Sequence, residues 1–235
     1  MEFFEIIAGC NMTEREWLEC TRPEPMLYYL YERVSERKLR LFGCGCCRRV
    51  WHLLKEVRHR RAIEIVEQYA DGQMTDQDLE SVRVEVSFPA EDDYWAAGAV
   101  DSLTAAHTNP PMIRVAAYAA AALADQADQV DAYMIIAGHY ERDERNMQCS
   151  LLRDIFGNPF RPPPAMAFSW LSWNDDTILK LAQAIYDDRV FDRLPILADA
   201  LEEAGCTNAD ILNHCRQPGE HVRGCWVVDL LLGKS

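Results

Sequence analysis

Apolar residues recur at helical spacing through most of this chain. Between about Ser35 and Tyr69 they follow one another at steps of three and four, which predicts one long helix with a single apolar face. That face consists of Leu39, Phe42, Cys46, Val50, Leu53 and Val57. A second region, from Pro111 to about Phe156, carries a heptad-like seam of mostly small residues and predicts a long Ala-rich helix. The seam consists of Ala116, Ala120, Leu123, Ala127, Val130, Met134 and Ala137.

Start and stop signals divide the rest of the chain into shorter helices. Capping-box spacing predicts helix starts at Thr13 and Thr75, each followed three residues later by an acid. The first of these helices should end before Pro23, and a short helix should follow over residues 26–34. Later helices are expected after the cap residues Asn174 and Asp175, between Pro195 and Gly205, after residues 207–210 and over residues 225–232.

A Pro/aromatic loop interrupts this helical pattern over residues 155–164. Its Gly-Asn-Pro turn and its run of prolines cannot join a helix. Phe168, Trp170 and Trp173 follow closely, so we expect the loop either to be strapped over the core or to form a docking surface.

These patterns predict an all-α protein. Its 235 residues suit a single compact helical domain over residues 12–235, with residues 1–11 as an N-terminal extension. Within that domain we expect N-terminal helices over 12–70, a variable acidic and Ala-rich middle over 71–145, and a C-terminal helical part over 146–235. An exposed small-residue seam would support a homodimer, whereas a buried seam would pack inside one molecule.

Composition and charge narrow the classes of partner. Apolar residues make up 49% of the chain and charged residues 26%, which is typical of a folded protein. The net charge of −14 argues against general nucleic-acid binding. Ten of the 24 basic residues nevertheless fall between Arg33 and Arg61. We expect this stretch to be neutralised mainly by acids of the same chain, with an acidic protein partner or RNA binding by a basic 33–61 helix as alternatives.

The nine cysteines are expected to be reduced thiols, because the sequence has neither a secretory signal nor a membrane span and therefore indicates a cytoplasmic protein. Three of them lie in the segment RLFGCGCCRRVWHLL, residues 40–54. On a continuous helix Cys44, Cys46 and Cys47 diverge and cannot share one metal ion, so Cys46 and Cys47 are expected in the core, with Cys44 on the side of Arg37 and Arg48. A redox Cys44/Cys47 pair would need the helix to break at its glycines and begin again.

The strongest candidate for a metal site lies near the C-terminus. Thiols and imidazoles are the ligands that zinc prefers, and His221 and Cys225 would share one face of a helix. The candidate ligands are Cys206, His214, Cys215, His221 and Cys225. Their spacing matches no standard zinc motif, so packing and capping are the alternative roles. Common nucleotide-binding and hydrolase motifs are absent from the sequence, and no catalytic residue is assigned.

Several blocks of the chain resemble a family of bacterial proteins of no known activity that share them. The blocks are MTEREWLECTRPEPMLYYL, RKLRLFGCGCCRRVWHLL, LLRDIFGNPFRP, LPILADALEEAGC and HCRQPGEHVRGCWVVDLLLGK. The resemblance extends from Met12 almost to the end of the chain. It implies a cytosolic helical protein and carries over no activity, cofactor or functional residue.

Together these features favour a non-enzymatic intracellular module for protein interaction or regulation. The residues expected to meet a protein partner are Arg48, Arg49, Phe156, Phe160 and Arg161. The alternative is a zinc-binding or thiol-redox protein that uses the C-terminal cysteines and histidines or the Cys44/Cys47 pair. RNA binding by the basic stretch is the weaker alternative.

Overall fold

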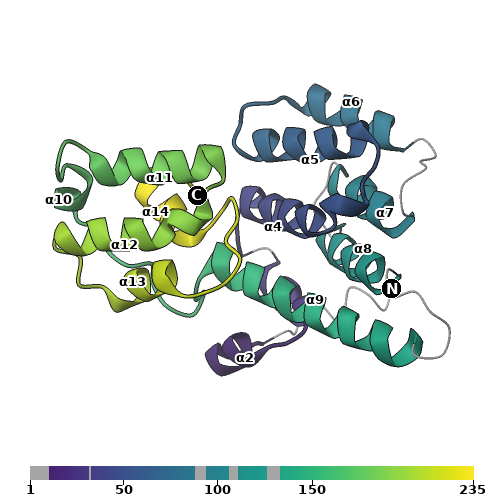
Figure 1. Ribbon diagram of the computed structural model, residues 1–235, viewed down its shortest axis with the longest axis horizontal. Helices are drawn as coiled ribbons and strands as arrows, with labels where there is room; N and C mark the ends of the chain where they lie inside the picture. The colour runs from purple at the N-terminus through teal and green to yellow at the C-terminus, as the bar shows by residue number, and fades with distance from the viewer. Residues whose placement is uncertain (1–10, 32, 88–93, 106–110, 126–132) are drawn as a thin grey trace. The chain divides into compact units, whose positions relative to one another are not determined.

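Figure 1 shows a computed structural model of the chain. It describes residues 11–31, 33–87, 94–105, 111–125 and 133–235, and the predicted N-terminal extension therefore lies almost wholly outside the described residues. Regular secondary structure in the described ranges is entirely helical, which confirms the all-α prediction. The chain divides into two compact units, Met1–Leu152 and Arg153–Ser235.

The first unit is built around α4. Its helices are α2 (Glu14–Glu19), α3 (Pro23–Leu30), α4 (Glu36–Arg49), the 3-10 turn η1 (Trp51–Leu53), α5 (Val57–Ala70), α6 (Asp76–Val86), α7 (Tyr94–Leu103), α8 (Pro111–Asp125) and most of α9 (Tyr133–Phe156). Helix α4 packs against α5, α7 and α8, and the α7–α8 pair forms the most extensive contact between described elements.

Both predicted capping boxes are confirmed. The hydroxyl of Thr13 accepts from the backbone N–H of Glu16 at 3.3 Å, and the carboxylate of Glu16 accepts from the backbone N–H of Thr13 at 2.7 Å. Thr75 and Asp78 make the same reciprocal pair at the start of α6. Each box satisfies amides that would otherwise have no partner in the first turn of its helix.

The prediction of one helix from Ser35 to Tyr69 is wrong. Helix α4 ends at Arg49, a single 3-10 turn follows, and α5 begins at Val57. The turn buries Leu53 and Leu54 and reverses the chain so that α4 and α5 pack against each other. Val57, which the pattern placed on the apolar face, is 76% exposed as a result. Contacts between α4 and α5 bury more apolar surface than a straight helix would, and they outweigh the local periodicity.

The three cysteines of α4 lie in the core. Cys44, Cys46 and Cys47 are all buried, so the expectation that Cys44 lies on the polar side is wrong. Helix α4 runs unbroken through Gly43 and Gly45, and no new helix N-terminus forms there. Burial raises the pKa of the Cys47 thiol, which is the opposite of what a reactive redox pair requires.

Gly43 sets how closely α4 approaches its neighbours. A Cβ at this position would lie 2.6 Å from Met112 Sδ of α8 and 2.8 Å from Leu103 Cδ1 of α7. Both distances are below van der Waals contact, so any other residue would force the side chains of Met112 and Leu103 out of their present positions. The glycine that looked like a helix breaker is therefore a packing position.

The Ala-rich region forms α8 and α9, and residues 126–132 between them lie outside the described residues. On α8 the seam residues Ala116 and Ala120 are buried, and the helix packs against α7, α4 and α3 of the same unit. These contacts show intramolecular packing for the part of the seam that is described. A homodimer stays a prediction.

Charge in the basic stretch is largely neutralised inside the first unit, as the sequence predicted. Arg48 Nη2 donates to Glu67 Oε2 at 2.9 Å, and Arg49 Nε donates to Glu144 Oε2 at 2.7 Å. The side chains of Glu67 and Glu144 are 2% and 1% exposed. A buried carboxylate needs a paired cation, so these two arginines stabilise the folded unit.

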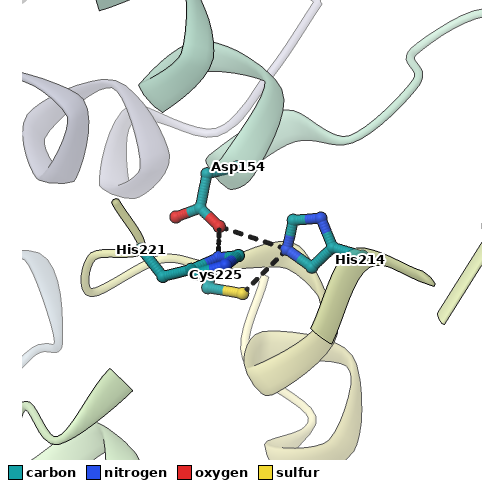
Figure 2. A group of neighbouring side chains, drawn as sticks. All are labelled: Asp154, His214, His221 and Cys225. Atoms are coloured by element: carbon teal, nitrogen blue, oxygen red, sulfur yellow. Dashed lines mark hydrogen bonds and ion pairs between the residues drawn. The ribbon is translucent and has the colours of Figure 1, made fainter. Parts of the chain in front are cut away.

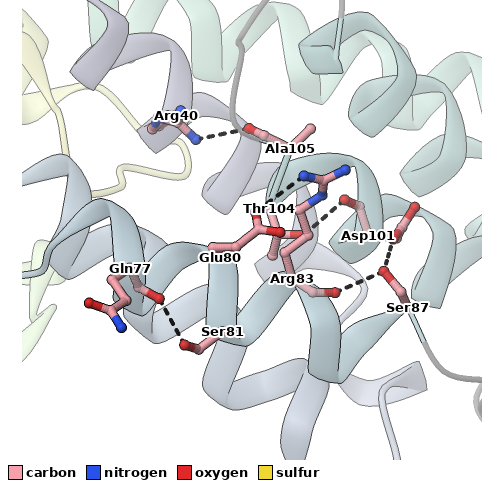
Figure 3. Close-up of polar contacts among 9 residues, drawn as sticks. All are labelled: Arg40, Gln77, Glu80, Ser81, Arg83, Ser87, Asp101, Thr104 and Ala105. Carbon is pink, nitrogen blue, oxygen red and sulfur yellow. Dashed lines mark hydrogen bonds and ion pairs between the residues drawn. The ribbon is translucent and has the colours of Figure 1, made fainter.

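Polar side chains also fix the ends of helices in this unit (Figure 3). Ser87, which follows α6, donates to the carbonyl of Arg83 at 2.8 Å and to Asp101 of α7 at 3.2 Å. Arg40 of α4 donates to the carbonyl of Ala105, just beyond α7, at 3.4 Å. Such bonds satisfy backbone groups that the helix ends leave open.

The second unit contains the end of α9 and the C-terminal helices. These are α10 (Phe168–Leu171), α11 (Thr177–Asp188), η2 (Phe191–Arg193), α12 (Leu194–Glu203), α13 (Ala209–Arg216) and α14 (Trp226–Leu232). Helix α11 packs on α12 and α14, and α12 packs on α13. Their shared core includes Ile178, Ile185, Leu197, Ile211 and Val228.

Helix boundaries in this unit follow the sequence signals with one exception. Gly205, at φ +90°, ends α12 as predicted, and Asn208 caps α13 by accepting from the amides of Asp210 and Ile211. The prediction that Asn174 and Asp175 cap α11 is wrong. The N-cap is Asp176, and its side chain makes no capping bond because residues 174–176 all adopt left-handed backbone conformations.

The Pro/aromatic segment is partly strapped over the core. Trp170 is buried and Trp173 packs against the same core, as expected for anchoring aromatics. Phe168 is 86% exposed and does not anchor. No helix in the described ranges combines the length and the apolar character needed to cross a membrane.

Removing the charge of Glu67 should destabilise the first unit. The Glu67→Gln variant leaves the guanidinium of Arg48 without its buried counter-charge, and we expect a loss of about 2–3 kcal/mol in the free energy of unfolding. Urea unfolding measures it. Glu85→Gln, at an exposed position of the neighbouring helix α6, is the control and should lose less than about 0.5 kcal/mol. Equal losses in the two variants would show that the buried pair does not stabilise the unit.

Candidate metal centre

Four side chains of the second unit point toward one another (Figure 2). They are Asp154, His214, His221 and Cys225, and each offers one ligand atom such that all four atoms lie within 4.8 Å of one another. Within the described residues this is the one group of histidines, cysteines and acids with such spacing.

Each ligand comes from a different local structure. Asp154 lies in the last turn of α9, and His214 lies on the buried face of α13. His221 lies in the segment that joins α13 to α14, and Cys225 is the N-cap residue of α14. The centre therefore connects three helices and one loop.

The carboxylate of Asp154 is the hub of the group. Its Oδ1 lies 2.6 Å from His221 Nδ1 and 3.1 Å from His214 Nε2, while its Oδ2 accepts from the backbone N–H of Val222 at 3.0 Å. Burial raises the pKa of Asp154, but the hydrogen bonds from the two histidines outweigh it, and the pKa lies below its usual value. The group is thus an anion, 3% exposed, in the core of the unit.

His214 uses one nitrogen toward two partners. Its Nε2 lies 3.1 Å from Asp154 Oδ1 and also 3.2 Å from Cys225 Sγ. Its Nδ1 lies 3.3 Å from the side-chain amide of Gln217. Rotation of that amide exchanges its oxygen and nitrogen, so the oxygen can accept from an Nδ1–H and leave the Nε2 lone pair free. An outer partner of this kind is what a metal-bound histidine uses.

This geometry differs from that of a Cys-His-Asp hydrolase. In such a triad the histidine meets the nucleophile with one ring nitrogen and the acid with the other. Here Nε2 of His214 meets both Cys225 and Asp154. One nitrogen carries at most one proton and cannot relay it between these two groups, whereas three atoms that converge on one point are arranged like metal ligands.

His221 is held mainly by Asp154. Its Nδ1 bonds to that carboxylate, whereas its buried Nε2 makes no hydrogen bond of good geometry to a described residue, although a hydrogen bond with the backbone of Gln217 contributes to the raised pKa of the ring. Burial by itself lowers the pKa of His221, but the hydrogen bond and charge of Asp154 raise it above its usual value. The ring nitrogen that faces the other three side chains is therefore Nδ1.

Cys225 is a thiol that only a cation would ionise. Burial and then the charge of Asp154 raise its pKa well above the usual value, although the amides of Val227 and Val228 act in the opposite direction. A bound metal ion reverses this balance because it deprotonates a coordinating thiol outright. Its place at the N-terminus of α14 adds a favourable dipole for the thiolate.

Size and charge both fit a divalent cation. Zinc binds nitrogen and oxygen at about 2.0–2.2 Å and sulfur at about 2.3 Å, so ligand atoms at the corners of a tetrahedron lie about 3.3–3.7 Å apart. The separations of 2.6, 3.1 and 3.2 Å between neighbouring ligand atoms are shorter than this, the shortest by about 0.7 Å, so these atoms would move apart around an ion, and all four already lie within 4.8 Å of one another. The carboxylate and one thiolate together carry two negative charges, which a divalent ion neutralises in a buried site.

The sequence identified three of the four residues. The structure brings together His214, His221 and Cys225, but His221 and Cys225 do not share a helical face as predicted, because α14 begins only after Cys225. Cys206 and Cys215 lie outside the group and are buried in the core. Burial, with the nearby charge of Asp154, raises the pKa of Cys215 to about 12, as for a packed thiol.

Asp154 was missed. It lies far from the C-terminal histidines in the sequence, and no spacing rule connects them. One signal was available: Asp154 interrupts an apolar series on α9 in which Leu151, Leu152 and Ile155 are all fully buried. An acid on such a face needs a partner in the core.

The residues predicted to meet a partner are placed as follows. Arg48 and Arg49 pair with the internal acids described above, and Arg161 is exposed. Phe156 and Phe160 are half-buried. Their binding to a protein partner stays a prediction.

Comparison with known proteins returned no match to a protein-family model, a curated protein or a solved structure. The interpretation of the centre therefore depends on its own geometry.

A side chain at position 157 should disturb the packing around the proposed metal centre. It follows α9 at φ +61°, and a Cβ there would lie 3.3 Å from Trp226, whose ring packs 5.1 Å from that of His214. Gly157→Ala should cost about 1–2 kcal/mol for the left-handed backbone and a further amount for the displaced indole. Urea unfolding measures the total.

Gly233→Ala is the matched control. Gly233 ends α14 at φ +64°, and a Cβ there meets nothing within 4 Å. It should lose only the backbone part. If both variants lose the same free energy, the contact with Trp226 does not constrain the centre.

Proposed function

We propose that the protein is a zinc-binding protein in which Asp154, His214, His221 and Cys225 hold one structural zinc ion. The observation that carries the proposal is the position of His214 Nε2, which faces both a carboxylate oxygen and a thiol sulfur. A shared cation accounts for that arrangement, and a proton relay does not.

The donor set favours zinc over the common hard cations. Magnesium and calcium prefer oxygen ligands, whereas a mixture of imidazole, thiolate and carboxylate suits zinc. The set differs from the usual structural zinc sites, which use only cysteine and histidine, by its single carboxylate. That carboxylate supplies the second negative charge that another cysteine would otherwise give.

The proposed role is structural because the protein itself offers four ligands. Catalytic zinc sites usually have three protein ligands and keep the fourth position for water or substrate. Asp154 and Cys225 are fully or almost fully buried, and the side chains of His214 and His221 are 8% and 6% exposed. An ion held there would join the end of α9 to α13 and α14.

Such a link would stabilise the second unit because its ligands come together only when the unit folds. Asp154 and His214 are 60 residues apart (214 − 154), so the unfolded chain seldom brings them together. A metal that binds only the folded arrangement shifts the equilibrium toward folding.

We further propose that this zinc-stabilised fold serves a non-enzymatic, intracellular role in protein interaction. Phe168 supports this wider role, because it is 86% exposed and follows a proline run in which Pro162 and Pro163 are also exposed. An aromatic ring in this position offers a large apolar contact area to a partner.

The purified full-length protein should contain about one zinc ion per chain. Cys225→Ala should lose that ion because it removes the thiolate and one unit of negative charge. Cys206→Ala removes a buried thiol of the same unit that lies outside the group, and it should keep the zinc. Elemental analysis measures the zinc content of the wild type and of the two variants. Wild-type protein that takes up no zinc after dialysis against the ion would overturn the proposal.

Removing the ion should also lower thermal stability. With free zinc at 100 times its dissociation constant, binding contributes about 2.7 kcal/mol, which corresponds to a melting temperature higher by about 10 °C or more for a unit of this size. Excess chelator should remove that increment from the wild type, and Cys225→Ala should show no response. Scanning calorimetry measures both. A wild-type melting curve that is the same with zinc and with chelator would contradict a structural role.

A further inference from the structure

Two of the four proposed ligands depend on a segment that is not helical. Residues 217–225 connect α13 to α14 and carry His221 and Cys225. Gly219 and Gly224 in this segment have positive φ angles of 157° and 94°. Because helical hydrogen bonds do not hold the segment, other contacts must fix the direction of its ligands.

Some of those contacts are made by the centre itself. The N–H of Val222 donates to Asp154, and the N–H of Cys225 donates to the carbonyl of Val222 at 3.0 Å. Both bonds lie within the group of ligands and their immediate neighbours. They attach the segment to the end of α9, but only through Asp154, which is itself one of the proposed ligands.

Arg223 provides an attachment from outside the group. Its Nε donates to the carbonyl of Tyr186 at 3.2 Å, and its Nη2 donates to the carbonyl of Asp187 at 3.1 Å. These are carbonyls of the last turn of α11, which ends at Asp188. The guanidinium also stacks on the ring of Tyr186, with its carbon 5.2 Å from the ring centroid.

An arginine suits this position for two physical reasons. The last carbonyls of a helix have no partner in the helix and carry a partial negative charge, so a cation there is favourable. The planar guanidinium can also donate to two carbonyls at once and stack on a ring, which a lysine ammonium cannot do in the same way. Tyr186 is itself fixed, since it is 2% exposed and Lys234 Nζ lies 4.5 Å from its ring centroid.

We infer that Arg223 is a positioning residue for the metal centre, and this inference rests on the proposed zinc site. Arg223 lies two residues from His221 and two from Cys225. Its two bonds to α11 fix the middle of the ligand segment, and both ligands are thereby held in the direction of Asp154 and His214. Without it the segment has more conformations to lose on binding, and metal affinity falls.

Arg216 offers a matched comparison. It too lies two residues from a ligand, His214, but that ligand is already fixed by α13. Its side chain is 38% exposed and pairs with Asp199 at 2.7 Å and Glu202 at 2.6 Å on α12. Removing Arg216 changes the same charge at the same distance in sequence and leaves the ligand segment attached.

The test is metal affinity in the full-length protein. Wild type and the variants Arg223→Gln, Arg223→Lys and Arg216→Gln are titrated with Co²⁺, whose visible bands report ligand geometry, and with Zn²⁺ against a chromophoric chelator. We expect Arg223→Gln to weaken both dissociation constants by about tenfold or more, which is typical of lost outer-shell support. We expect altered cobalt bands in the same variant, an intermediate value for Arg223→Lys, and a change of less than about twofold for Arg216→Gln.

The outcomes separate the two proposals. Wild-type protein that binds neither metal overturns the zinc site, and the role of Arg223 is then overturned with it. A wild type that binds metal, with Arg223→Gln as tight as Arg216→Gln and with unchanged cobalt bands, overturns the role of Arg223 alone. If Arg223→Gln does not fold, which circular dichroism shows, the comparison of Arg223→Lys with Arg216→Gln decides in the same way.

Discussion

The second unit depends on a carboxylate that has no access to water. Asp154 is 3% exposed and carries its charge into a core of aliphatic and aromatic side chains. A buried anion is tolerated only when cations or hydrogen-bond donors surround it, and here two imidazoles and one backbone amide do so. This requirement fixes the position of α13 and of the segment that leads from it to α14, because both supply donors to the carboxylate.

The same carboxylate explains why the neighbouring groups form a set of ligands. Beside it the thiol of Cys225 has a raised pKa, and Nε2 of His214 faces the carboxylate and the thiol at once, so these atoms converge on one point without a cation between them. A divalent ion would neutralise the carboxylate and one thiolate together. Helical hydrogen bonds of α13 fix the position of His214. The contact of Arg223 with α11 would fix the segment that carries the other two C-terminal ligands in the same way.

The first unit solves a related problem with arginines. Glu67 and Glu144 are almost fully buried and are paired with Arg48 and Arg49, so the basic stretch that suggested a binding surface serves mainly to compensate internal acids. Gly43 lies inside a helix although glycine disfavours helices, because the absence of a side chain there leaves room for residues of α7 and α8. The local signal for breaking the helix at its glycines was overridden by burial.

The sequence by itself determined the features that depend on neighbouring residues. The helical spacing of apolar residues and the caps at Thr13, Thr75 and Gly205 specified an all-α fold and many of its boundaries, and the chemistry of His214, His221 and Cys225 marked them as candidate ligands. Only the tertiary structure decided the features that depend on distant residues. The reversal of the chain between α4 and α5, the place of Cys206 and Cys215 in the core, and the recruitment of Asp154 from a helix 60 residues before His214 (214 − 154) all follow from packing. Spacing along the chain carries no information about such contacts, because folding sets them through burial and charge compensation across the whole unit.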